Sequence, residues 1–226
     1  MTMGDGWAEV VRDRLAPGRL LPLGTAADGV WLAERAARQV LERAVLAVRG
    51  AVPGPLRIGA AEEAPEAVPG PFPVPPGGVP AGPLRITAEL AVVASGRPLP
   101  ETAGEVREAL LAAARGLDLA VTEVDLRVAE LLEEAPAPGE PAPPPPDRTP
   151  PASEDPAGRA VLAVPGVVAL ADALGAPVHR TADAVRVECA VAVGRPPAEV
   201  ARAARAAAAT AAPEGAAVTV VVTELR

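Results

Sequence analysis

Lysine and tyrosine are absent from this chain, and aromatic residues of any kind are scarce. All of its basic residues are arginines, and Trp7, Trp31 and Phe72 are its complete aromatic set. Half of the residues are apolar, but alanine dominates that half. Such side chains bury little area each, so we expect modest stability for each folded unit.

Cysteine and histidine each occur once, as Cys189 and His179. A lone cysteine excludes a disulfide framework and a cysteine-based metal site, and Cys189 is expected to be a small core residue. His179 falls in a predicted hairpin, where no triad or metal set can be drawn around it. We find no glycine-rich phosphate loop, zinc spacing or paired-carboxylate motif. The sequence therefore predicts no catalytic, cofactor-binding or metal-binding residue, no cofactor, no small-molecule substrate and no enzymatic activity.

Positive charge and long apolar runs are also in short supply. The formal net charge is −8 and the pI about 4.8, which disfavours a nucleic-acid partner because that normally requires a basic face. The longest uncharged apolar run, residues 160–171, contains Pro165 and Gly166 and is too short to span a bilayer. The first residues include Asp5 and Glu9 and lack the apolar stretch of a signal peptide. We therefore expect a cytoplasmic protein whose membrane contact, if any, is indirect.

What the chain does contain is an internal repeat. Residues 43–52 return as residues 159–168, and the copies differ only at Arg49/Pro165 and Ala51/Val167. Two further matches follow in the same order, residues 84–92 with 185–193 and residues 124–131 with 218–225. Three ordered matches indicate a duplicated unit. The offset falls from 116 to 101 and then to 94, so the first copy carries 15 extra residues before the second match and 7 more after it.

Hydrophobic periodicity predicts the same elements in each copy. In the first we expect a helix at 28–48 capped by Asp28, a short strand at 56–58, a strand at 84–92, a helix at 101–115 and a strand at 122–128. In the second we expect a helix at 157–164, strands at 178–181 and 185–193, a helix at 198–212 and a strand at 218–224. Charged residues such as Arg85, Glu89, Arg186 and Glu188 are expected on the outer strand faces. The predicted fold is α+β, with two tandem α-β-β-α-β modules, each a three-stranded sheet with two helices on one face.

Proline-rich stretches suggest the domain boundaries. We expect an N-terminal helix and connector at 1–24, a first module at 25–134 with an insertion at 62–83, a linker at 135–156 and a shorter second module at 157–226. The insertion is open to two interpretations, a loose loop or a ligand for a proline-reading domain.

Two motifs resemble a known family. They are Val164-Pro165-Gly166-Val167 and the run Gly116-Leu117-x-Leu119-x-Val121-x-x-Val124-Asp125-Leu126-x-Val128. Together with the module order they resemble the alkaline shock or general stress proteins of Gram-positive bacteria, and the whole chain resembles an actinobacterial group named after a nucleopolyhedrovirus fibrous protein. The first copy departs in having Arg49 where the family has proline, and the second ends in Glu214-Gly215-Ala216 without the Gly-Leu pair.

The resemblance implies a non-enzymatic protein of cell-envelope stress homeostasis that associates with itself and is held near the membrane by an anchor protein. We accordingly expect a cytoplasmic scaffold or adaptor whose partners are proteins, such as a second copy or a membrane anchor. The alternative is a nucleic-acid-binding module of the KH type, which has a similar mix of elements but would need a basic groove and a GxxG loop.

The predicted boundaries can be tested by limited proteolysis. We expect the first cuts within residues 135–156 and 62–83, because proline-rich connectors are accessible to proteases and the flanking modules are folded. Fragments can be identified by mass spectrometry. A protected fragment that runs intact across residues 143–146 would contradict the two-module interpretation.

Overall fold

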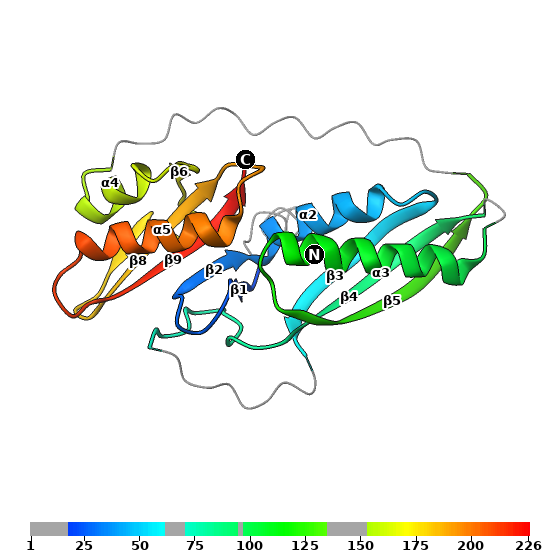
Figure 1. Ribbon diagram of the computed structural model, residues 1–226, viewed down its shortest axis with the longest axis horizontal. Coiled ribbons are helices and arrows are strands. Elements are labelled where there is room, and N and C mark those ends of the chain that lie inside the picture. The colour runs from blue at the N-terminus through cyan, green and yellow to red at the C-terminus, as the bar shows by residue number, and fades with distance from the viewer. Residues whose placement is uncertain (1–17, 62–70, 95–96, 135–152) are drawn as a thin grey trace, which may run out of the picture.

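The computed structural model describes residues 18–61, 71–94, 97–134 and 153–226, and this part of the chain has an α+β fold. It contains four helices and nine strands in two mixed sheets that lie side by side along the long axis (Figure 1). The helices are α2 (Glu34–Leu46), α3 (Leu99–Gly116), α4 (Pro156–Leu162) and α5 (Pro197–Thr210). The strands are β1 (Leu20–Pro22), β2 (Val30–Ala33), β3 (Ala51–Ala60), β4 (Leu84–Val93), β5 (Val121–Leu132), β6 (Val167–Leu170), β7 (Val178–Arg180), β8 (Ala184–Val191) and β9 (Ala217–Leu225).

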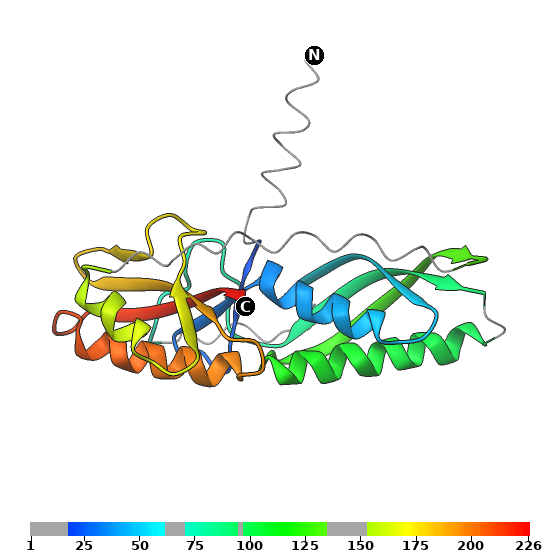
Figure 2. The same cartoon turned by 90° about the horizontal axis from the view of Figure 1, so that it is seen from above.

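The smaller sheet has the strand order β3-β4-β5, with β4 antiparallel to β3 and parallel to β5. Helices α2 and α3 lie together on one of its faces (Figure 2). Alternation along β4 confirms the predicted inner face, because every second side chain is buried there. These buried residues are Leu84, Ile86, Ala88, Leu90 and Val92.

The larger sheet has the order β1-β2-β9-β8-β6, and β7 also pairs with β8. Strands β8 and β9 are parallel, whereas β6 and β7 each run antiparallel to β8. The predicted hairpin of β7 and β8 is confirmed, with His179 opposite Arg186. Strand β6 was not predicted. It forms at Val167–Leu170, directly after the turn at Gly166, whose φ of +100° suits glycine.

Two predictions for the start of the chain are wrong. The expected connector contains a strand, β1, and the helix expected from Asp28 begins only at Glu34, because the apolar run Val30–Ala33 forms β2. Strand β2 pairs in parallel with β9, with Trp31 opposite Val221, and is buried along its whole length. Asp28 instead caps a turn, where it accepts hydrogen bonds from the backbone N–H and the hydroxyl of Thr25. Pairing with a distant strand thus outweighs local helix propensity.

This pairing means that residues from both ends of the chain build the larger sheet. Strands β1 and β2 precede α2 but belong to the same sheet as β8 and β9. Whether residues 25–134 and 157–226 fold independently of each other stays a prediction. The predicted N-terminal helix and most of the 135–156 linker lie outside the described residues.

The proline-rich insertion is described from residue 71 onward, and this part packs against the protein. The backbone of Leu20 bonds to both Gly77 and Val79, and Val79 is buried. The ring of Phe72 lies under the Arg205 guanidinium at 4.7 Å from the centroid. The segment 71–83 therefore packs against β1 and α5.

Glu34 joins three elements at the start of α2. Its carboxylate accepts hydrogen bonds from the backbone N–H of Arg19 at 3.2 Å and of Ile58 at 3.0 Å, and Arg38 lies 3.8 Å away. The residue is only 6% exposed. Burying a carboxylate is favourable only when hydrogen bonds replace its water, which these two backbone groups do.

We predict that Glu34→Ala lowers the free energy of unfolding by about 2 kcal/mol, because it leaves two backbone donors without their acceptor. Glu34→Gln keeps one acceptor oxygen and should cost less. Glu42→Ala, on the same helix, is the matched control and should cost less still. Urea unfolding followed by circular dichroism measures all three. Equal losses for Glu34→Ala and Glu42→Ala would contradict this role.

Candidate functional site

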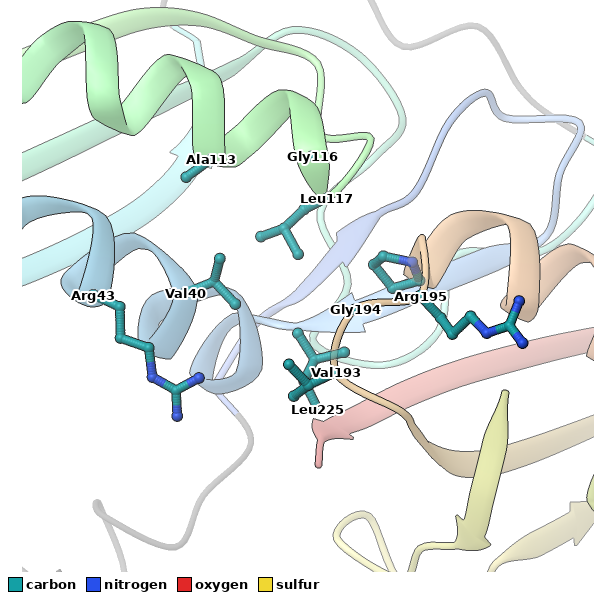
Figure 3. Close-up of a pocket in the computed structure, with 10 residues that line it drawn as sticks. Val40, Arg43, Ala113, Gly116, Leu117, Val193, Gly194, Arg195 and Leu225 are labelled. Carbon is teal, nitrogen blue, oxygen red and sulfur yellow. The ribbon is translucent and has the colours of Figure 1, made fainter. Parts of the chain in front are cut away.

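A pocket of about 380 Å³ lies between the two halves of the molecule (Figure 3). Figure 3 shows Val40, Leu117, Val193 and Leu225 directed toward its centre, while Arg43 and Arg195 extend away from it. Val40 of α2 is only partly buried because it faces this pocket. The complete lining is Val40, Arg43, Ala113, Gly116, Leu117, Val193, Gly194, Arg195, Pro197 and Leu225.

The pocket walls are mainly aliphatic. The described residues that line it carry aliphatic groups and two guanidinium groups, without a carboxylate, thiol, hydroxyl or imidazole. Acid–base or nucleophilic chemistry needs at least one such group in contact with the substrate. The pocket can therefore seat an apolar group near positive charge.

An ion network close to this pocket holds the halves together. Arg202 of α5 donates to the carboxylate of Asp28 at 3.0 Å and to that of Asp118 at 2.5 Å. Asp118 occupies the turn between α3 and β5 with φ of +59°, and its carbonyl accepts a hydrogen bond from Gly24. Burial opposes ionisation of Asp28, but hydrogen bonds from Thr25 and Arg202 outweigh it and hold the pKa of Asp28 below its usual value.

His179 and Cys189, the histidine and the cysteine of the sequence, do not line this pocket. His179 is exposed on β7, and Cys189 is fully buried in β8, as predicted for a core residue. Burial, and next the neighbouring Glu188 carboxylate, raise the pKa of the Cys189 thiol to about 12. Within the ranges that the structure describes, no group of three His, Cys, Asp or Glu residues could hold a metal ion.

Glu188 was predicted to be a solvated residue on an outer strand face, and this prediction is wrong. It is 0% exposed, and its carboxylate accepts hydrogen bonds from the backbone N–H of Leu174 at 2.9 Å and from Arg186 at 3.2 Å. The segment between β6 and β7 leaves the edge of β8 at Ala171 and returns to it at Pro177, since both bond to the Glu188 backbone, and in between Leu174 reaches the Glu188 carboxylate. Burial raises the pKa of Glu188, although Leu174 and Arg186 oppose the shift.

The second candidate surface is the free edge of β5. In the described part of the chain, β5 pairs only with β4, whereas the corresponding strand β9 lies between β8 and β2. Strand β9 is buried along most of its length, but β5 is half-buried or exposed throughout. Val128 is 37% and Leu131 59% exposed. Leu131 also lines a second hollow of about 380 Å³, together with Leu99 and Arg97 at the start of α3.

The alternation of residues 122–128 predicts an inner strand face made of Thr122, Val124, Leu126 and Val128. The register with β4 confirms this for the last three, whereas a register shift leaves Thr122 exposed. Such alternation does not show whether the edge of the strand is covered, so the sequence did not predict this surface. The distribution of proline is the one feature of the sequence that could have indicated an unprotected edge. The edge strand β3 contains Pro53 and Pro55, whose nitrogens cannot donate to a further strand, but β5 contains no proline.

The outer face of the smaller sheet carries cross-strand ion pairs, as the sequence suggested for Arg85 and Glu89. Arg85 of β4 pairs with Asp125 and with Glu123, and Arg127 of β5 donates to Glu89 at 3.0 Å. These pairs are at least partly exposed, so they contribute little to stability. They do place the opposite charges of Asp125 and Arg127 side by side on the outer face of the free edge.

No helix in the described ranges is both long enough and apolar enough to cross a membrane. Comparison of the chain with family models, curated proteins and solved structures finds no match.

The buried Glu188 predicts a specific pH dependence. The folded state binds the Glu188 proton more tightly than the unfolded chain does, because the pKa of Glu188 is raised in the fold. Protonated Glu188 therefore stabilises the fold fully at a pH below the ordinary carboxyl pKa. This stabilisation is lost as the pH rises through the raised pKa. Glu188→Gln removes this loss, so its free energy of unfolding should improve relative to the unaltered protein as the pH rises above the ordinary glutamate pKa of about 4.3. Urea titrations across that range measure the difference, and parallel curves for both proteins would contradict the assignment.

Proposed function

We propose that this protein is a scaffold or adaptor that works by associating with protein partners through the free edge of β5, and not by catalysis. The observation that carries the proposal is the contrast between β5 and β9. Both close their sheets in parallel beside a central strand, but β2 covers the edge of β9 and no described strand covers that of β5. An uncovered strand edge presents a row of backbone donors and acceptors to another chain.

Part of this proposal is that the two halves are tandem copies of one α-β-β-α-β module. Each half contains a helix, an antiparallel strand pair, a second helix and a parallel closing strand, in that order. The ordered sequence matches fall in corresponding elements, including β4 with β8 and β5 with β9. On this interpretation β2 occupies, on the second copy, the position that a partner strand takes on the first.

Two of the groups that might perform chemistry, the Cys189 thiol and the Glu188 carboxylate, are engaged in the fold. The Cys189 thiol is enclosed and holds its proton, and the Glu188 carboxylate satisfies the backbone of Leu174. A catalytic nucleophile or base must instead reach substrate with its reactive atoms. These placements favour a binding role over turnover.

The cellular setting follows from the resemblance to alkaline shock proteins. We place the protein in the cytoplasm, in cell-envelope stress homeostasis, with a second copy of itself or a membrane anchor protein as partner. Its contact with the membrane is then indirect. The negative net charge of −8 supports a protein partner over nucleic acid.

The test compares two exposed leucines. Leu131 on β5 is 59% exposed and Leu46 at the end of α2 is 61% exposed, so an aspartate at either position should leave the fold intact. We expect Leu131→Asp to weaken association by about tenfold or more, because it places an unpaired charge in an apolar contact. Leu46→Asp, the control, should associate normally.

The measurement is sedimentation of each purified protein, first alone and then with an extract of the native cells. Thermal melting confirms that both variants remain folded. A strict monomer that recovers no partner would end the proposal, as would turnover of a metabolite by the purified protein. Equal association of Leu131→Asp and Leu46→Asp would show that the contact does not lie at β5.

A further inference from the structure

Strand β5 is the one long strand of the described sheets whose edge is left unprotected. On β3, Pro53 and Pro55 lack N–H groups, and the Ile58 N–H donates to Glu34. On β1, the backbone of Leu20 bonds to residues 77 and 79. Strand β6 has only four residues. Natural sheets protect their edges in these ways, so the exposed edge of β5 indicates a contact surface.

The apolar side chains of β5 are arranged symmetrically about Leu126. The register with β4 places five residues on the inner face, opposite the buried residues of that strand. The pairing of β5 with β4 skips one β5 residue on each side of Leu126, at positions 122 and 129. The inner-face residues therefore lie two and five positions before Leu126 and two and five positions after it. They are Val121, Val124, Leu126, Val128 and Leu131.

This symmetry suits one particular neighbour, a second β5 running antiparallel with Leu126 opposite Leu126. Residues equally distant from the centre then face each other. Val124 meets Val128 of the second copy, and Val121 meets its Leu131, so every inner-face pair is apolar. The contact would cover Val128 and Leu131, which are 37% and 59% exposed in the single chain. Such a pairing is isologous, because each copy contributes the same surface.

The outer face adds charge complementarity in the same register. Asp125 meets Arg127 of the second copy, and the twofold axis repeats this ion pair. Both groups can accept a further partner, since the Asp125 side chain is 49% and the Arg127 side chain 75% exposed while paired within the chain. A parallel, in-register pairing would instead set Asp125 against Asp125 and Arg127 against Arg127. Like charges directly opposite each other are destabilising, so charge favours the antiparallel arrangement.

We infer that the partner at the β5 edge is a second copy of this chain, paired antiparallel about Leu126 with reciprocal Asp125–Arg127 ion pairs, so that the two smaller sheets join into one continuous sheet. The inference rests on the proposed function, association at this edge, and specifies the occupant and the register. The inner-face pairs and the backbone hydrogen bonds supply affinity, and the ion pairs select direction.

A charge-exchange experiment tests the register on the full chain. Asp125→Arg places arginine against arginine in the homodimer, and Arg127→Asp places aspartate against aspartate, so each variant alone should dimerise about tenfold or more weakly than the unaltered protein. An equimolar mixture of the two variants should recover the dimer. Asp125→Arg carries arginine at both 125 and 127, and Arg127→Asp carries aspartate at both, so each arginine faces an aspartate in the mixed dimer.

Sedimentation equilibrium measures the three samples, and circular dichroism melts check that each variant is folded. Recovery in the mixture supports the inference in a way that general destabilisation cannot imitate. Two weakened variants with no recovery on mixing would overturn the register.

Cysteine cross-linking gives an independent measurement. Under mild oxidation Leu126→Cys should form a covalent dimer, because opposed residues of paired strands lie within disulfide reach. Val124→Cys alone should not, but a mixture of Val124→Cys with Val128→Cys should. Cys189 is enclosed in the core and serves as the unreactive background. Equal cross-linking at Leu126 and Val124 would overturn the centre of symmetry.

The outcomes also separate this inference from the proposed function. If the unaltered protein is monomeric but recovers a protein partner that Leu131→Asp loses, the second-copy inference fails and the scaffold proposal stands. If it is monomeric and recovers nothing, both fail. A dimer unaffected by every β5 variant would leave self-association but place it on another surface, which also overturns the inference.

Discussion

The arrangement of the whole chain depends on the parallel pairing of β2 with β9. The pairing joins a strand near the start of the described chain to the last strand, and the chain passes directly from β2 into α2. Glu34 then secures that junction to Arg19 and to Ile58 of β3. One short strand therefore completes the larger sheet, positions the first helix and encloses β9 on its second edge. The smaller sheet has no corresponding strand among the described residues, and β5 is left open.

Local periodicity predicted the strands that alternate and the helices with clear ends. Strand β4, helix α3 and the closing strands β5 and β9 all lie close to where the sequence placed them, because side-chain alternation and helical spacing are local properties. Strand β2 was assigned to a helix because its four apolar residues fit either structure. Only contact with Val220–Val222, far away in sequence, decides between them. Strand β6 was missed for a similar reason, since four residues carry too little pattern.

Burial of charge was harder to predict than secondary structure. Glu188 and Glu89 both follow the alternation of outward-facing residues, yet Glu188 is enclosed and Glu89 is not. The difference comes from the segment between β6 and β7, which covers one strand and has no counterpart over the other in the described chain. The same limit applies to the candidate surface. The alternation along β5 resembles that along β9, and only the position of β2 makes one edge buried and the other exposed.

Association through an exposed edge, as proposed for β5, requires that one partner is favoured over many others, and the composition of β5 bears on this selectivity. Its backbone groups would pair with almost any extended chain, so they supply affinity without selectivity. The opposite charges of Asp125 and Arg127 restrict this choice, because a second copy paired in the parallel direction in register meets like charges at both positions. Asp125 and Arg127 contribute little to the stability of the single chain, where water screens their existing ion pairs. In the proposed pairing, the role of these two charges is to discriminate between neighbouring strands, while the exposed Val128 and Leu131 supply apolar contact.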